Sequence, residues 1–302
     1  MKILICGGAG FIGWNLTLHL LDQRHQIIIL DRNKSKIVSH GLQSIEVDLL
    51  QPELFKETWF EGVEAVVNLS GKDIFTPWTR KAMELIRQSR IDVNKNLVDY
   101  IARLKQKPRV FISASAVGYY GDRGEDALSE GEPHGQGFLA EVCVAWEAEA
   151  RKAEKLGMRS VQVRTAPVLL KGGGLLGQML KSMRFGFTFL FGSGSQWFSW
   201  IHMYDLIRIY HWAITDETLA GPINACSPNP MRFRAFLAHL TKYKKALVVP
   251  FPGWLLKLFL QETADVVLYS QKMMPSKLLE RNFRFSYPTL DKAFRDIFVG
   301  NK

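Results

Sequence analysis

The chain has 302 residues, 47% of them hydrophobic, and a formal net charge of +10 at pH 7. This length and hydrophobic content exclude a disordered chain and predict one sizeable domain with a smaller lobe. The basic residues are distributed, as in residues 79–96 and 242–249, and no nucleic-acid-binding motif accompanies them. We therefore expect solvated basic surfaces and no DNA or RNA partner.

No segment of the sequence predicts a membrane anchor or a metal site. The longest hydrophobic stretch, residues 248–260, contains two prolines and a lysine and is too short to span a bilayer. The N-terminal apolar run is shorter than the hydrophobic region of a secretory signal. Cys6, Cys143 and Cys226 are scattered without metal-ligand spacing. We expect a location in the cytoplasm, or in an organelle matrix if the source is eukaryotic.

The first predicted elements are a buried strand over residues 1–5 and a helix from residue 14, joined by the glycine-rich stretch "CGGAGFIG". Gly7, Gly10 and Gly13 are spaced three residues apart, a variant of the dinucleotide-binding pattern. Such glycines permit a tight turn, close approach of a pyrophosphate, and close packing of helix against strand. The free N–H groups and positive dipole of the helix N-terminus attract phosphate.

The second predicted strand, "QIIIL" at residues 26–30, ends at Asp31, about 20 residues after the glycines. An acidic residue there suits the free 2′-hydroxyl of NAD, whereas the adjacent Arg32 suits the 2′-phosphate of NADP. Lys34 and Lys36 add positive charge to the same loop. The pattern favours NADP and leaves NAD open, because Arg32 can pair with the phosphate while Asp31 turns away.

Further strands are predicted at residues 43–49, 65–71, 109–116 and 159–170, and a long helix at 78–105. Alternation of strands and helices predicts an α/β fold, a Rossmann-type doubly wound parallel sheet with right-handed crossovers. Ligands bind such sheets at the carboxyl ends of the strands, so one crevice is expected there. We expect residues 1–165 to form the nucleotide-binding domain. Residues 166–302 are then mostly a smaller C-terminal substrate lobe, with some segments returning to the first domain.

The predicted lobe carries two segments with open interpretations. Gly172, Gly173 and Gly174 precede a helical pattern, as in a flexible wall over the nicotinamide or in a plain loop-to-helix connection. Trp197 and Trp200 lie in a predicted turn that leads to a strand. Aromatic residues there suit either a substrate cavity or packing between lobes.

Several motifs occur in an order that resembles a known superfamily. They are "GGAGFIG", "VDL" ending at Leu49, "NLSG" ending at Gly71, "SASAVGYYG" ending at Gly121 and "WIHMYDL" ending at Leu206. Their order resembles the extended, epimerase/dehydratase-like branch of the short-chain dehydrogenase/reductases. "FLAEVCVAWEAEA" and "KGGGLLGQM" are similar to an atypical subgroup of epimerase-family proteins without an assigned substrate. The resemblance spans nearly the whole chain.

The resemblance implies which residues contact the dinucleotide. The pyrophosphate would lie along the glycine loop, the adenine at the third strand end, and a ribose at the fourth. Together with Gly13 and Asp31 from the motif itself, the implied cofactor-binding residues are Gly7, Ala9, Gly10, Phe11, Ile12, Arg32 for the 2′-phosphate, Asp48, Leu49, Leu69, Ser70 and Gly71.

The superfamily's chemistry uses a serine that holds the substrate oxygen, a tyrosine acid/base and a lysine four residues later. Free tyrosine has a pKa of about 10. The positive charge of the lysine lowers that pKa, so that the tyrosine can exchange protons at neutral pH. The resemblance places Ser115 at the serine position, with Ser113 as the alternative. Phe138 stands where the tyrosine is expected and Val142 where the lysine is expected. Neither side chain can transfer a proton, so the usual proton relay is predicted to be absent.

Another side chain could replace the missing tyrosine as acid or base, and the first candidate is Tyr119, which follows Ser115 closely in the sequence. The remaining candidates are Tyr120, Glu130, Glu141 and His202. Each also suits an ordinary structural role, such as packing at a strand end, solvation on a helix surface, or a hydrogen bond beside Asp205.

Two functional hypotheses follow. The first is an NADP-binding oxidoreductase or epimerase-like enzyme acting on an unknown small molecule. The second is a catalytically inactive NADP(H)-binding sensor or regulatory protein. A retained serine and a substrate lobe favour the enzyme, and the missing tyrosine and lysine favour the sensor. The chain is expected to be a monomer or a homodimer.

Overall fold

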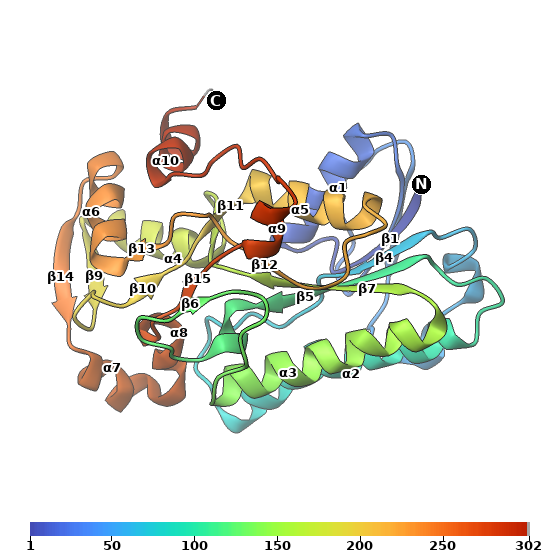
Figure 1. Cartoon of the computed structure of the whole chain (residues 1–302), viewed down its shortest axis with the longest axis horizontal. Helices are drawn as coiled ribbons and strands as arrows, with labels where there is room; N and C mark the ends of the chain where they lie inside the picture. Colours follow the sequence, from blue (N-terminus) through green and yellow to red (C-terminus); the bar gives the residue numbers. More distant parts are fainter. Residues whose placement is uncertain (301–302) are drawn as a thin grey trace.

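A computed structural model describes residues 1–300. Its centre is a seven-stranded sheet in the order β12-β7-β5-β4-β1-β2-β3 (Figure 1), and every neighbouring pair is parallel. The strands are β1 (Lys2–Cys6), β2 (Gln26–Asp31), β3 (Leu42–Glu46), β4 (Ala65–Asn68), β5 (Val110–Ala116), β7 (Arg159–Thr165) and β12 (Gly221–Ala225). The predicted Rossmann-type doubly wound parallel sheet is confirmed. The order reverses between β1 and β4, where such folds bind their ligands.

Helices cover both faces of this sheet, which explains why its central strands are uninterrupted apolar runs. α1 (Phe11–Asp22) and α5 (Met203–Thr215) pack together on one face, and α2 (Arg80–Ala102) and α3 (Phe138–Arg151) on the other (Figure 1). Each face buries its own apolar cluster against its helix pair. Because both faces are packed, the sheet is rigid, and the side chains at its strand ends are held in defined positions.

A third apolar cluster lies beyond the carboxyl ends of the strands, toward the left of Figure 1. It is rich in aromatic side chains, including the fully buried Phe236 and Phe294. The elements around it are α4 (Gly174–Met183), β9 (Phe187–Phe191), β10 (Trp197–Phe198), β13 (Met231–Arg232), α6 (Phe233–Tyr243), β14 (Leu247–Phe251) and α10 (Leu290–Val299). The shorter remaining elements are β6 (Ala127–Leu128), α7 (Gly253–Leu260), α8 (Asp265–Leu268), β15 (Lys272–Met273) and α9 (Ser276–Glu280).

The strand expected over residues 159–170 is interrupted. β7 ends at Thr165, and β8 (Val168–Leu169) pairs instead with β11 (Ile201–His202). Pro167 has no N–H to donate, and its carbonyl accepts a hydrogen bond from Ile201 N. The proline therefore directs the chain out of the main sheet at its carboxyl end. The sequence after Pro167 later supplies α5, which covers one face of the sheet, and β12, the edge strand beside β7.

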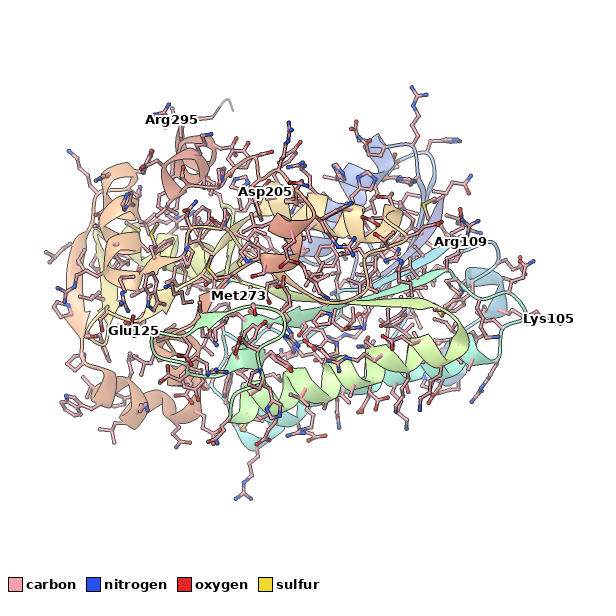
Figure 2. The ribbon with its side chains drawn as sticks, in the orientation of Figure 1. Lys105, Arg109, Glu125, Asp205, Met273 and Arg295 are labelled. Atoms are coloured by element: carbon pink, nitrogen blue, oxygen red, sulfur yellow. The ribbon has the colours of Figure 1, made fainter. Side chains whose placement is uncertain are left out.

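Basic side chains lie at both ends of the molecule. In Figure 2, Lys105 and Arg109 lie at the end of the sheet where β5 begins, whereas Arg295 lies on α10 near the C-terminus. Within residues 1–300, no helix is both long and apolar enough to cross a membrane. In the same residues, no three His, Cys, Asp or Glu side chains are grouped in a way that could hold a metal ion.

Three histidines meet where α1 packs on α5, and they predict a pH-dependent stability. His19 Nε2 lies 3.0 Å from His211 Nδ1, and the ring of His25 lies edge-on to that of His211. Burial is the main cause that lowers the pKa of all three side chains. In the unfolded chain these histidines have their ordinary pKa of about 6.5. Below that pH the unfolded chain therefore binds more protons than the folded chain does. This contribution to stability is present above that pH and is lost as the pH falls through the lowered values.

We expect the melting temperature to fall between pH 7.5 and pH 5.5, and the His211→Gln variant to show a shallower fall. Thermal unfolding at several pH values measures both slopes. A variant slope equal to that of the unmodified chain would show that this cluster does not contribute to the pH dependence.

Candidate functional site

The glycine loop connects β1 to α1 with a geometry that other residues cannot adopt. Gly7 has a positive φ of +77°, and a Cβ there would lie 2.9 Å from the backbone of Leu69 and Ser70. A Cβ at Gly13 would overlap the carbonyl oxygen of Gly7. Gly10 precedes α1 and gives it no side-chain cap. The first amides of the helix are therefore free to bind an anion.

A groove of about 200 Å³ runs from this loop along the strand ends. It brings together the predicted residues from four separate segments. Its lining is Gly7, Ala9, Gly10, Asp31, Arg32, Asn33, Asp48, Leu49, Leu50, Leu69, Ser70, Gly71, Ser89 and Val93. Phe11 and Ile12 lie at the adjoining cavity described below. Gly13 lines neither space, and its effect on the groove is through the close approach of α1 to the loop.

Asp31 and Arg32 differ in how much of their hydrogen-bonding capacity is used. Asp31 Oδ2 accepts a hydrogen bond from Ala9 N at 3.1 Å, and Oδ1 accepts one from Asn33 N at 2.9 Å. Arg32 is exposed at the groove, and none of the hydrogen bonds or ion pairs among residues 1–300 involves its guanidinium. Asp31 therefore shapes the loop, and Arg32 is available for an anion.

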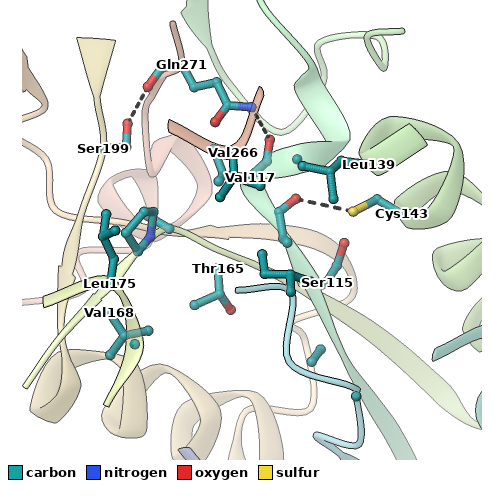
Figure 3. Close-up of a pocket in the computed structure, with 18 of the residues that line it drawn as sticks. Ser115, Val117, Leu139, Cys143, Thr165, Val168, Leu175, Ser199, Val266 and Gln271 are labelled. Carbon is teal, nitrogen blue, oxygen red and sulfur yellow. Dashed lines mark hydrogen bonds between the residues drawn. The ribbon is translucent and has the colours of Figure 1, made fainter. Parts of the chain in front are cut away.

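A second cavity, of about 340 Å³, adjoins the groove and shares Leu69, Ser70 and Gly71 with it. Figure 3 shows Ser115, Leu139, Leu175 and other residues around this cavity. Most of the lining side chains are apolar. Ser70 Oγ is buried at the junction and has no hydrogen-bond partner among the described residues. The two spaces therefore lie side by side at the strand ends, with Leu69, Ser70 and Gly71 between them.

Ser115, near the end of β5, is held by a buried ion-pair network. Its Oγ donates a hydrogen bond to Glu147 Oε1 at 2.7 Å. The same carboxylate accepts bonds from Arg164 Nε and Nη2 at 2.8 and 2.9 Å, and from Arg151 Nη2 at 2.9 Å. Ser113 does not line the cavity, because its Oγ bonds to Asn94 and to the Ala114 carbonyl. Of the two serines, Ser115 is the one that lines the cavity.

α3 carries both positions at which the resemblance places the missing tyrosine and lysine, Phe138 and Val142. Phe138 does not line the cavity; its ring packs edge-on to Trp78. The residues of α3 that line the cavity are Leu139, Val142, Cys143 and Trp146. Burial is the main cause that raises the pKa of the Cys143 thiol to about 12. Phe138 and Val142 stay the predicted positions of the missing tyrosine and lysine, and none of the α3 side chains that line the cavity transfers protons at neutral pH.

Tyr119 and Tyr120 are not part of the cavity lining. The ring of Tyr119 lies against the guanidinium of Arg164, 3.4 Å from its centroid to Cζ. Tyr120 is fully buried, and its hydroxyl donates to Asn224 Oδ1 at 2.7 Å and accepts from Arg164. Burial is the main cause that raises its pKa to about 12. Both rings support Arg164, which argues against the catalytic role predicted for Tyr119.

The other three candidate acids or bases have structural partners. Glu130 is buried and accepts hydrogen bonds from the backbone N–H groups of Asn224 and Lys277. Glu141 is exposed on α3 and lies 3.8 Å from Arg87. His202 caps α5, because its Nδ1 accepts a bond from Tyr204 N. None of the three lines the cavity.

Several cavity residues are ones that the sequence analysis did not select. The C-terminal half supplies Tyr269, whose hydroxyl donates to Asp265 Oδ2 at 2.8 Å. Burial is the main cause that raises the pKa of Tyr269 to about 12. α2 supplies Arg90, from a helix whose basic residues look solvated in sequence. Their positions depend on tertiary packing, for which a single sequence holds no local signal.

The two segments of the lobe whose roles the sequence leaves undecided, residues 172–174 and 197–200, lie at or near the cavity. Gly174 and Leu175 line the cavity, and a Cβ at Gly173 would overlap the ring of Phe11. The glycine-rich segment is thus part of the cavity wall. Trp197 also lines the cavity, whereas Trp200 is fully buried among the aromatic residues of the third cluster.

The parallel sheet, its glycine loop and the strand-end crevice together define a Rossmann-type dinucleotide-binding protein. Comparison with protein families agrees with this class. Residues 3–226 match the NAD dependent epimerase/dehydratase family, and the chain belongs to that family. Residues 251–297 match a domain of unknown function, DUF1731.

Similar proteins occur in plants and bacteria. The chain is 36% identical over 301 residues to the chloroplastic epimerase family protein SDR39U1 homolog of Arabidopsis thaliana, covering 98% of this chain and 86% of that protein. It is 31% identical to the epimerase family protein YfhF of Bacillus subtilis, covering 100% of this chain and 99% of that one.

Solved structures share the fold. Human epimerase family protein SDR39U1, crystallised with NADPH, matches with a TM-score of 0.85 and 26% identity over the whole of both chains. UDP-glucuronic acid 4-epimerase of Bacillus cereus, in complex with UDP-glucuronic acid and NAD, matches with a TM-score of 0.81 over 99% of this chain and 98% of that one. Its 19% identity shows the fold alone.

Proposed function

We propose that this chain binds NADP(H) in the groove and acts as an oxidoreductase or epimerase-like enzyme on a small molecule in the adjoining cavity. The observation that carries the proposal is that groove and cavity adjoin each other and share Leu69, Ser70 and Gly71 in their linings. A dinucleotide whose phosphates lie at the N-terminus of α1 would direct its nicotinamide toward the cavity that contains Ser115. The unpartnered Ser70 Oγ fits a hydroxyl of the cofactor at this junction.

Bound NADPH would supply hydride chemistry, and this chain would position the substrate. Glu147 accepts four hydrogen bonds and so acts as the positioning residue for Ser115. The Ser115 hydroxyl, whose proton is directed to Glu147 in this structure, would turn that proton to the substrate and so hold a carbonyl oxygen at the cavity wall. The described lining of the cavity contains no lysine and one tyrosine, Tyr269. We infer that water supplies the proton of a product hydroxyl, because the usual tyrosine and lysine relay is missing.

The Ser115→Ala variant tests the enzymatic proposal. We expect turnover to fall about 100-fold, the effect of removing one hydrogen bond to a developing oxyanion, while NADPH binding stays intact. NADPH consumption with a panel of aldehydes and ketones measures turnover, and Ser113→Ala serves as the matched control. Equal turnover in Ser115→Ala and the unmodified chain would contradict the role of Ser115.

The Arg32→Ala variant tests the cofactor preference. Charge-assisted hydrogen bonds between a guanidinium and a phosphate contribute about 1.5–3 kcal/mol. We therefore expect NADPH affinity to fall about 10- to 100-fold and NADH affinity to stay within a factor of about two. Titration calorimetry measures both, with Lys36→Ala as a control in the same loop. Equal losses of affinity for NADPH and NADH would contradict the assignment of Arg32 to the 2′-phosphate.

A sensor of the NADPH/NADP ratio is the second candidate. It is favoured by Leu139 and Cys143, which present no proton relay on the cavity face of α3. This candidate predicts binding of both cofactor forms without turnover of any carbonyl compound, by the unmodified chain and by Ser115→Ala alike.

A further inference from the structure

Arg90 is a cation in the cavity wall without a carboxylate partner. It lines the cavity but not the groove, so it lies on the substrate side of the junction. Among residues 1–300, no Asp or Glu oxygen forms an ion pair with its guanidinium; its Nη1 bonds only to the Ile86 carbonyl and to Ser89 Oγ. Burial is the main cause that lowers the pKa of Arg90. The side chain nevertheless stays charged at neutral pH, as arginine does in proteins.

The surroundings fix this guanidinium in place. Its Cζ lies 5.3 Å from the ring centroid of Trp146, in a cation–π contact that needs no counter-ion. On the other side, a Cβ at Gly71 would lie 3.1 Å from Cζ, so glycine there leaves room for the guanidinium. The remaining donors, Nε and Nη2, have no hydrogen-bond partner in the described part of the chain. A guanidinium held this way presents an unused fork of donors.

The same chain of contacts links Arg90 to the proposed reaction centre. Trp146 is followed by Glu147, whose carboxylate holds Ser115 Oγ at 2.7 Å. Arg90 and Ser115 therefore border one cavity and are joined through adjacent residues of α3. A molecule held by its charged end at Arg90 can place a second functional group near Ser115.

We propose that the cavity takes an apolar small molecule that carries one carboxylate, and that Arg90 binds this carboxylate. The proposal rests on the proposed function and narrows its substrate class. A guanidinium that is largely removed from water is stabilised by an anion. A carboxylate is a suitable anion, because its two oxygens can accept two parallel hydrogen bonds from the guanidinium. Most of the other lining side chains are apolar, and they suit a hydrocarbon or aromatic body.

The charge pattern of the lining favours a monoanion over a phosphate or a sugar nucleotide. Arg90 is the one Lys or Arg side chain in the described lining of the cavity. A phosphate dianion buried there would keep an uncompensated charge, which is costly away from water. Asp265, the acidic residue of the lining, already accepts a bond from Tyr269 and would repel an anion at its own end. The carboxylate is thus confined to the end of the cavity at Arg90.

The experiment compares charged and neutral ligands of equal shape on the holoprotein. Titration calorimetry is run with the full chain saturated with NADP, using octanoate and 3-phenylpropanoate against octanamide and 3-phenylpropanamide. We expect at least one acid to bind about 10-fold more tightly than its amide, the effect of one charge-assisted bond. Equal affinity of acid and amide in both pairs would overturn the proposal.

Variants of α2 assign the effect to Arg90. Arg90→Gln is expected to abolish the preference for the acid, Arg90→Lys to keep part of it, and Arg87→Gln, one turn earlier and outside the cavity lining, to keep all of it. A preference for the acid that survives in Arg90→Gln, or in Arg90→Lys with unchanged size if the glutamine variant does not fold, would also overturn the proposal. NADPH affinity is measured in the same proteins. Its absence in the unmodified chain would refute the proposed function, whereas the acid-to-amide ratio tests the Arg90 subsite separately.

Discussion

Replacing Arg164 by methionine is expected to lower the free energy of unfolding by about 3–5 kcal/mol. Arg164 and Glu147 are both essentially fully buried and joined by two hydrogen bonds, at 2.8 and 2.9 Å. Burial acts to lower the pKa of Arg164, but the hydrogen bonds to Glu147 and its charge raise it overall. The substitution leaves the Glu147 carboxylate with only Arg151 as a charged partner. It also removes the contact of the guanidinium with the Tyr119 ring and its hydrogen bond to the Tyr120 hydroxyl.

Urea denaturation measures the loss, and a double variant separates its cause. Arg164→Met combined with Glu147→Leu removes both charges, so we expect it to recover at least half of the lost stability. The double variant leaves the Ser115 hydroxyl without its acceptor, and turnover is expected to fall as in Ser115→Ala. A loss below about 1 kcal/mol for Arg164→Met would show that the ion pair is not what holds this wall of the crevice.

The second large effect is expected at Gly13, where alanine should lower NADPH affinity more than about 100-fold. Its Cβ would overlap the Gly7 carbonyl oxygen and approach Gly8 Cα to 2.7 Å, so α1 must move away from the loop. Both atoms belong to the backbone, which cannot give way as a flexible side chain can. The movement displaces the free amides that would bind the pyrophosphate.

Gly131→Ala is the matched control for this variant, because a Cβ at Gly131 would meet nothing within 4 Å. We expect the control to keep both its NADPH affinity and its melting temperature. Calorimetry and thermal unfolding on the two variants distinguish loss of the loop from general instability. Retention of NADPH affinity in Gly13→Ala would show that the helix N-terminus is not the phosphate site.

Much of the fold could be predicted because its signals are local. The apolar strands, the glycine spacing and the acid at Asp31 occur within 31 residues and define the first half of the crevice. The predicted groove residues indeed lie together at the strand ends. The use of Asp31 was harder to predict, because its bond to Ala9 N depends on how the loop folds back onto β2.

The cavity could be predicted less well, because it depends on contacts between distant segments. Phe138 and Leu139 are equally apolar, and only packing shows that Leu139 lines the cavity whereas the ring of Phe138 lies against Trp78. Tyr119 is close to Ser115 in sequence, yet its ring packs against Arg164. Tyr269 reaches the cavity from the C-terminal half, and its distance along the chain hides that role.

The central claim, that the crevice is an NADP(H) site, is tested most directly by thermal unfolding with NADPH, NADP, NADH and NAD at equal concentration. A ligand at about 100 times its Kd stabilises the folded state by about 2.7 kcal/mol, which shifts the melting temperature measurably. We predict stabilisation by NADPH and NADP that exceeds that by NADH and NAD, and its loss in Gly13→Ala. No stabilisation by any of the four would contradict both the enzyme and the sensor.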